Sequence, residues 1–290
     1  MTNNRDKRPV FLLSVLAPVL LLTASLVGIL SDDGGKPYIF TSQRGEAVDI
    51  YGGEGLYQFD NTYKAIGFRS FDWVSLVVVM PLFILGIYRY RRGQFKGQLL
   101  LAALFTYLAY IYAIGVMGNT FNSMFLVWTA LFSTGLFGWV LTLAGIDMAA
   151  LPKKLAANFP GKSLAVYIIL VGLILLLQYL SEVLSAYTTG NPPASLDHYT
   201  TLELASLELG IMIPLHLAAG VLLWKKRAWG YLMAILLTFT AGMVFIALSL
   251  SLLLFYFSFG QGIMPDMVIT IAITLVACGF SLVVFKRVKD

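Results

Sequence analysis

Cysteine and histidine are nearly missing from this chain, and their scarcity excludes several kinds of site. Cys278 is the only cysteine among 290 residues. One thiol cannot form an internal disulfide, a Cys-x-x-Cys redox pair or a zinc knuckle, so Cys278 is interpreted as a small apolar filler of a membrane helix. A haem held between helices needs two histidines at membrane depth, but only His216 lies deep, while His198 lies in a loop. We therefore expect no metal and no cofactor.

Charged residues are also scarce. Only 12% of the residues are charged, 59% are hydrophobic and the mean hydropathy is +0.82, whereas a soluble domain has about 25% charged residues. The loops between the apolar runs are too short to hold a separate soluble domain. A single membrane domain covering residues 1–290 is expected.

The motifs of familiar enzymes are absent from the sequence. The stretch NFPGKS (158–163) ends like a phosphate-binding loop, but Ala156 stands where that loop needs glycine. Neither an H-E-x-x-H zinc motif nor a G-x-S-x-G nucleophile elbow occurs. A membrane enzyme would need an unfamiliar set of catalytic groups, so we expect no catalytic residues, although an enzyme remains an open alternative.

Eight apolar runs predict an all-α membrane protein with eight transmembrane helices. They cover residues 9–31, 71–90, 97–117, 120–146, 163–183, 203–224, 228–258 and 266–285. Each run is long enough to cross about 30 Å of hydrocarbon as a helix. The first run is longer than the apolar core of a signal peptide and has no clean cleavage site after it, so it is interpreted as an uncleaved span.

The basic residues predict the orientation. Five clusters hold 16 of the 20 basic residues and fall on one side of the membrane when the N-terminus is placed inside. Because Lys and Arg near spans stay in the cytoplasm, both termini are predicted to be cytoplasmic. The clusters are expected to contact anionic lipid headgroups. No basic and aromatic platform for nucleic acid is present.

The first loop, residues 32–70, is predicted to lie outside the membrane. The stretch YIFTSQRGEAVDIY (38–51) is typical of a β-hairpin with Arg44 and Gly45 at its turn. Asp60 is placed to cap a short helix over residues 61–68. The apolar residues around that helix would let it lie on the membrane surface.

Part of this region resembles a known group of proteins. The stretches YGGEGLYQFD (51–60), FRSFDWVSL (68–76) and MPL (80–82), followed by the basic turn RRG (91–93), carry the resemblance. They resemble an uncharacterised group of bacterial multi-pass membrane proteins with a Y-G-x-G-L-Y-x-x-D segment ahead of the second span. This chain has one more glycine within that segment. The resemblance covers the first half well and the rest loosely. It implies a bacterial cytoplasmic-membrane protein and no particular activity.

The other sizeable outer loop, residues 185–203, is stiffened by Pro192 and Pro193. Asp197, His198 and Glu203 lie close together in the sequence, but scattered ligands of this kind are more typical of solvated loop residues than of a metal site. Together with the first loop, this segment is expected to border an outer vestibule. The candidate vestibule residues are Asp60, Tyr57, Asn122, Glu182, His198 and Glu203.

The second and sixth spans are similar enough to suggest an internal duplication. The second reads FDWVSLVVVMPLFILGIYRYRRG (71–93) and the sixth LASLELGIMIPLHLAAGVLLWKKRAWG (204–230). Each has an acid in its outer half, a Met shortly before Pro-Leu, and a basic turn that leads into the next span. The halves 1–150 and 151–290 would then be parallel four-span repeats, as in some transporters.

The stretch LELGIMIPLH (207–216) is the best candidate for a functional site. With the span centred near residue 213, Glu208 lies about 7 Å outward of the midplane and His216 about 5 Å inward. A charge at such depth costs about 3 kcal/mol. Pro214 leaves the Gly210 carbonyl without its donor, and Pro81 does the same for Val77 in the second span. The predicted substrate or ion pathway comprises Glu208, His216, Asp72, Gly210, Pro214 and Pro81.

Two interpretations of this stretch remain open at the sequence level. Glu208 and His216 could hydrogen-bond neighbouring helices and simply hold them together, or they could line an outward-facing pathway. The second interpretation predicts a transporter or channel-like protein for a small solute or ion, linked to protons. The alternative function is a non-transporting sensor, immunity or assembly-partner protein that acts through its outer loop.

Overall fold

The chain is a multi-pass membrane protein built from helices. The computed structural model describes residues 7–260 and 264–290, and within them eight helical segments are long and apolar enough to cross a membrane. Six are single helices and two are interrupted, as described below. The uninterrupted ones are α1 (Arg8–Leu30), α4 (Phe95–Gly118), α5 (Phe125–Ala144), α6 (Gly161–Thr189), α9 (Ala228–Phe259) and α10 (Met264–Arg287).

The second and sixth spans each contain one π-helical turn. The second consists of α2 (Thr62–Val74), η1 (Ser75–Val79) and α3 (Met80–Arg91). The sixth consists of α7 (Glu203–Leu207), η4 (Glu208–Met212) and α8 (Ile213–Trp224). In both, proline is the second residue after the π-helix, and a proline within a span is where the helix pattern is expected to change.

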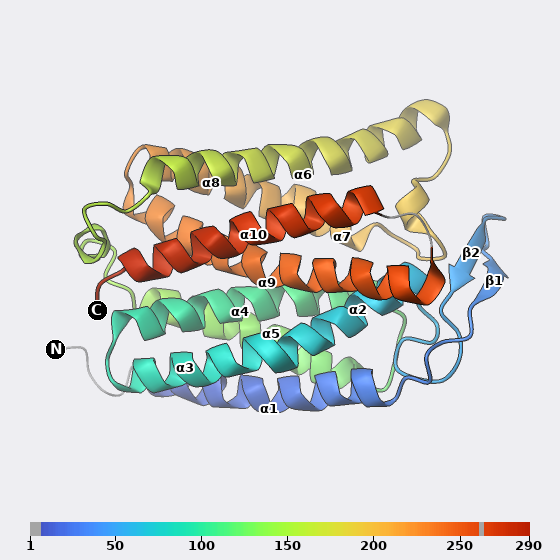
Figure 1. Cartoon of the computed structure of the whole chain (residues 1–290), viewed down its shortest axis with the longest axis horizontal. Coiled ribbons are helices and arrows are strands. Elements are labelled where there is room, and N and C mark those ends of the chain that lie inside the picture. Colours follow the sequence, from blue (N-terminus) through green and yellow to red (C-terminus); the bar gives the residue numbers. More distant parts are fainter. Residues whose placement is uncertain (1–6, 261–263) are drawn as a thin grey trace.

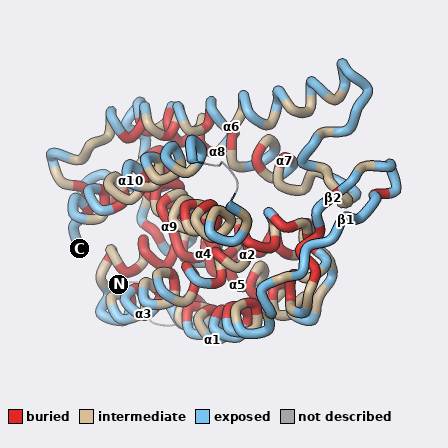
Figure 2. Tube along the Cα trace, turned by 45° about the vertical axis from the view of Figure 1, so that its right-hand side comes forward, coloured by how far each residue is buried: buried red, intermediate tan, exposed pale blue. Residues whose placement is uncertain are grey.

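The helices run side by side along the long axis of the molecule (Figure 1). The start of α1 and the end of α10 lie at one end, which we call the basic end because α3 finishes there with Arg89 and Arg91. The strands lie at the opposite end, which we call the hairpin end. Figure 2 shows buried residues concentrated on the central helices and exposed residues on the outward faces of α1, α6 and α10. Those outward faces are apolar, as expected for surfaces in lipid.

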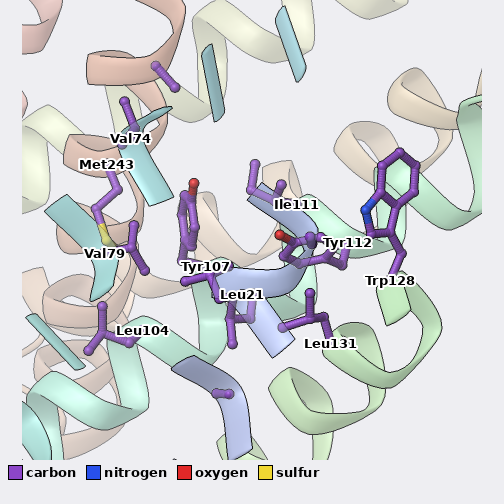
Figure 3. Packing of buried hydrophobic residues seen from close by; sticks show 14 of the residues in the cluster. Leu21, Val74, Val79, Leu104, Tyr107, Ile111, Tyr112, Trp128, Leu131 and Met243 are labelled. Atoms are coloured by element: carbon purple, nitrogen blue, oxygen red, sulfur yellow. The ribbon is translucent and has the colours of Figure 1, made fainter. Parts of the chain in front are cut away.

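Helix α4 is the centre of the packing. Side chains from α1, the second span, α5 and α9 meet it, with Leu104, Tyr107 and Leu131 fully buried (Figure 3). Helix α5 approaches α4 closely at Gly135, where an added Cβ would lie 2.5 Å from the Ala109 nitrogen. Small residues at such crossings let membrane helices pack by close van der Waals contact.

A β-hairpin occupies the first loop. Strands β1 (Tyr38–Thr41) and β2 (Ala47–Ile50) pair antiparallel, with Tyr38 opposite Ile50 and Thr41 opposite Ala47. Gly45 has φ +89° at the turn, a conformation that glycine adopts without steric cost.

The separate surface helix predicted over residues 61–68 was wrong. The helix begins at Thr62 and continues into the second span, and its N-cap is Asn61, whose side chain accepts a hydrogen bond from the Lys64 N–H at 2.7 Å. The reason is tertiary packing, because Ile66 and Phe68 are buried in the bundle instead of facing a membrane surface. Asp60, the predicted cap, makes other contacts.

Candidate functional site

Glu208 begins the π-helix η4 and is buried, with 4% of its surface exposed. Its Oε1 accepts a hydrogen bond from the Tyr110 hydroxyl of α4. Its Oε2 is buried and has no hydrogen-bond partner among the described residues. A buried polar atom without a partner is costly, so this oxygen is the atom at which a proton, ion or polar ligand would be stabilised.

The backbone beside Glu208 adds further acceptors. The Ile213 N–H donates to the Glu208 carbonyl, and therefore not in the usual α-helical manner to Leu209. Pro214 has no N–H for the Gly210 carbonyl. The carbonyls of Leu209 and Gly210, the two residues that follow Glu208, therefore lack their usual α-helical donors. Gly210 is exposed, and a Cβ added there would meet nothing within 4 Å.

His216 lies farther along the same span and is also buried, at 5% exposure. Its Nδ1 lies 2.7 Å from the Met212 carbonyl of its own helix. It packs against α6, where a Cβ added at Gly172 would come 3.0 Å from the His216 Cβ. No hydrogen bond joins His216 to Glu208 in the described part of the chain, so the two predicted pathway residues share a helix without direct contact.

Asp72 belongs to a different cluster. It was expected near the membrane rim as a partner for Glu208, but it is buried at 4% exposure and accepts a 2.6 Å hydrogen bond from the Tyr57 hydroxyl. Gly28 of α1 makes room for it, since a Cβ there would lie 1.9 Å from Asp72 Oδ2. Asp72 therefore fastens the first loop to the first two spans. Pro81 follows η1 in the second span, away from any described contact with Glu208.

A partly buried ion pair near Asp72 was not predicted from the sequence. Arg69 Nη1 lies 2.6 Å from Asp32 Oδ2, and the Tyr51 hydroxyl donates to the same carboxylate oxygen at 3.0 Å. Burial raises the pKa of Tyr51 to about 12, so the hydroxyl remains a donor at neutral pH. The signal in the sequence was weak, because the two residues are 37 positions apart, with Asp32 just after α1 and Arg69 within α2.

Two of the candidate vestibule residues, Asp60 and Glu203, belong to a network of side chains that we call the loop clasp. It is formed by Asp60, Lys64, Asp197, Tyr199 and Glu203, and Asp197 joins it by accepting a hydrogen bond from the Asn61 side chain. Asp60 is fully buried, and its Oδ1 accepts from the Thr120 N–H at 2.8 Å and from the Tyr199 hydroxyl at 3.0 Å. Burial raises the pKa of this carboxyl. Lys64 pairs with Glu203 at 2.5 Å. The clasp ties the first loop to the segment before the sixth span.

The other candidate vestibule residues make local contacts. His198 Nε2 lies 3.1 Å from the Phe59 carbonyl, and burial lowers the pKa of its ring. Asn122 accepts from the Met124 N–H at 2.9 Å, and Glu182 accepts from the Ser195 N–H at 3.1 Å. Within residues 7–260 and 264–290, no three His, Cys, Asp or Glu side chains are grouped so that they could hold a metal ion.

Comparisons with protein-family models, with curated proteins and with solved structures find no match to this chain. The function is therefore inferred from the geometry of its own residues.

Proposed function

We propose that the protein is a transporter or channel-like protein for a small solute or ion, linked to protons, with Glu208 as the group that binds the proton or ion. The observation that carries this proposal is the buried Glu208 Oε2, which has no partner in the described residues and lies beside two carbonyls without their usual donors. Broken helices whose free carbonyls coordinate ions are the typical binding elements of membrane transporters.

The energetics favour a bound proton or cation at Glu208. A carboxylate at this depth costs about 3 kcal/mol, and one hydrogen bond from Tyr110 leaves the second oxygen uncompensated. Either a proton or a cation would remove that cost.

The orientation is part of the proposal. The basic end carries the clusters that hold most of the Lys and Arg residues, so it is assigned to the cytoplasm by the positive-inside rule. The hairpin end then lies outside. The resemblance to bacterial multi-pass proteins supports a bacterial cytoplasmic membrane.

The two halves are proposed to be parallel repeats, with each residue of the second span equivalent to the residue 133 positions later in the sixth. The π-helices Ser75–Val79 and Glu208–Met212 then coincide, as do Pro81 with Pro214, and α3 and α8 have 12 residues each. In both π-helices the N–H of the residue before proline donates to the first π-helical carbonyl.

The turns that follow these helices support the same register. Gly93 (φ +73°) and Lys226 (φ +55°) both adopt the left-handed conformation, and their N–H groups both donate at 2.9 Å, to Tyr90 and Leu223 respectively. The glycines four residues later match as well, since a Cβ at Gly97 would lie 2.4 Å from the Tyr90 nitrogen and one at Gly230 2.1 Å from the Leu223 nitrogen.

In this register Ser75, and not Asp72, is the residue of the second span that is equivalent to Glu208. Ser75 lies 3.5 Å from the Tyr107 hydroxyl, and Glu208 is bonded to Tyr110, so both π-helices present a polar side chain to a tyrosine of α4. The acid at this position is confined to the second half. The proposed ion-binding group is therefore Glu208 alone, with Asp72 as an anchor for the first loop.

Flux through liposomes tests the proposed function. Purified wild type would be reconstituted and proton, sodium and potassium gradients imposed, beside Glu208→Gln and the matched control Glu182→Gln, which changes a glutamate in an exposed hydrogen bond to Ser195. We expect Glu208→Gln to abolish flux and Glu182→Gln to keep it. Equal flux in wild type and Glu208→Gln, or no flux in any protein, would contradict the proposal.

The alternative, a partner-binding membrane protein, is favoured by the hairpin. At the hairpin end, three apolar or aromatic side chains of β1 are exposed, namely Tyr38 (48%), Ile39 (64%) and Phe40 (42%). If the hairpin binds a partner, the double substitution Tyr38→Ser with Ile39→Ser abolishes partner binding, and with it the sensing, immunity or assembly function. Liposome flux is unchanged. The transport proposal expects the biological activity and the flux both to be retained.

A further inference from the structure

A cavity opens at the basic end of the bundle. Its volume is about 240 Å³, and it lies between the start of α1, the turn from α3 to α4, the end of α5 and the short helix η2 (Leu151–Lys154). The lining includes the polar and charged side chains of Lys7, Tyr90, Gln94, Gln98, Asp147 and Lys154. None of these groups takes part in the proposed transport site.

The cavity is rich in hydrogen-bond donors. The Lys154 ammonium lies 4.4 Å from the centre of the Phe95 ring, which fixes it against the wall of the cavity. The Gln94 side-chain oxygen accepts a hydrogen bond from Arg89 at 3.4 Å. Among the described residues, the Gln94 amide NH₂ donates no hydrogen bond. Phe95, at the start of the 24-residue helix α4, also lines the cavity and adds the positive end of a helix dipole.

Among the described residues that line the cavity, Asp147 is the only acid, and it is already engaged. Asp147 Oδ1 accepts from the N–H groups of Ala149 at 3.0 Å and Ala150 at 3.1 Å, so its charge stabilises its own turn. The Gln98 amide donates to the Thr142 carbonyl at 3.1 Å. The described lining thus has two lysines against one occupied carboxylate, which gives it a net positive charge. An anion with several acceptor oxygens, such as a phosphate group, matches that chemistry.

One wall of the cavity borders the lipid-facing surface. Leu141 of α5 lines the cavity and is 40% exposed, and its neighbour Val140 is 47% exposed. A ligand with a phosphate inside the cavity could therefore extend an acyl chain along α5 into the bilayer. Basic pockets between membrane helices at the cytoplasmic face are suited to anionic headgroups.

We propose that this cavity is a specific binding site for a phosphate group, supplied by the headgroup of an anionic phospholipid and held by Lys7 and Lys154. The proposal is independent of the transport function, because it rests on different residues at the other end of the bundle.

Lipid titration of the purified full chain in detergent tests the site. The probes are short-chain phosphatidylglycerol, the matching phosphatidylcholine and inorganic phosphate, and the readout is the rise in Tm with added probe. The variant is Lys7→Gln with Lys154→Gln. The matched control is Lys225→Gln with Lys226→Gln, which removes the same charge at the same end of the bundle but outside the cavity.

We expect phosphatidylglycerol to bind the wild type and the control alike, and the cavity variant to bind it about fivefold more weakly for each lysine removed. Competition by inorganic phosphate would show that the phosphate group alone is recognised, whereas no competition would show that the acyl chain is required; both support the site. Equal affinity in the cavity variant, equal losses in both variants, or no preference for phosphatidylglycerol over phosphatidylcholine would overturn it.

Discussion

At the scale of single residues, the buried carboxylates differ in their position and in their partners. Asp72 fastens the first loop to two spans, through its hydrogen bond with Tyr57 and its close contact with Gly28. Asp60 also fastens the first loop, although its Oδ2 is buried without a partner among the described residues. Glu208 has an unpartnered oxygen of the same kind, but it lies within a span at the start of a π-helix, and this combination distinguishes the proposed site.

Removing the Tyr57 hydroxyl should destabilise the protein. Tyr57→Phe leaves the buried Asp72 without its 2.6 Å donor, and an unsatisfied buried acceptor costs about 1–3 kcal/mol. Tyr63→Phe is the matched control, since Tyr63 is 57% exposed. Thermal unfolding in detergent measures both. Equal stability of the two variants would show that Tyr57 contributes packing alone.

His198 predicts a pH dependence at the hairpin end. Burial lowers the pKa of its ring below 6.5 in the folded protein, so the unfolded chain binds more protons between the two pKa values. Stability therefore falls as the pH drops from 6.5 through the folded pKa. The added proton would sit on Nδ1, which is buried without a partner among the described residues. Burial raises the pKa of the nearby Asp60, which has the opposite effect above pH 3.8.

The measurement is Tm in detergent at pH 7.5 and pH 5.5 for wild type and His198→Asn. Wild type should lose more stability on acidification than the variant. An identical loss in both would assign the pH dependence to other groups.

The sequence identified the buried polar residues of the sixth span, but not the residues with which they form hydrogen bonds. A glutamate within an apolar run is visible in the sequence alone. Its partner Tyr110 lies 98 residues away, and contacts of that kind depend on how helices pack. Asp72 was assigned to the pathway of Glu208 for the same reason. Its hydrogen bond with the loop residue Tyr57 could not be predicted from the sequence.

At the scale of helices and turns, the apolar runs predicted the eight helical segments of the described residues that are long and apolar enough to cross a membrane, since the length of a run follows from bilayer thickness. The hairpin was predicted from two short stretches of aromatic and β-branched residues with Arg44 and Gly45 between them. The start of the second span, at residue 62 instead of 71, was missed because Lys64 and Arg69 interrupt the apolar pattern. Both are paired with acids of other segments. The π-helices had no sequence signal beyond the two prolines.

The two equivalent turns make a prediction about backbone strain. Lys226 has φ +55° where its counterpart Gly93 is a glycine, and the left-handed conformation costs a non-glycine residue about 1 kcal/mol. Lys226→Gly should therefore stabilise the protein by about 1 kcal/mol, and Gly93→Lys should destabilise it by a similar amount.

Lys225→Gly is the control, because Lys225 has φ −78° and glycine offers no relief there. Unfolding in detergent gives the three values. If Lys225→Gly stabilised the protein, or if Gly93→Lys left its stability unchanged, the turns at Gly93 and Lys226 would not be equivalent. The proposed repeat would then lose this support.

At the scale of the whole molecule, all described basic clusters meet at one end and the hairpin and loop clasp at the other (Figure 1). With Cys278 replaced by serine, single cysteines at the exposed positions Gln43 and Lys162 report the orientation. In intact cells, a membrane-impermeant maleimide should label Gln43→Cys and spare Lys162→Cys. The reverse pattern would invert the proposed topology and place Glu208 in the inner half.

The most direct test of the central claim joins chemical modification of Glu208 to flux in the same liposomes. A membrane-soluble carbodiimide reacts with protonated carboxyl groups, and mass spectrometry gives the fraction of Glu208 modified. We predict that flux falls in proportion to that fraction, both in wild type and in the active control Glu182→Gln. Undiminished flux with Glu208 fully modified, or loss of flux while Glu208 remains unmodified, would contradict the role of Glu208 as the ion-binding group.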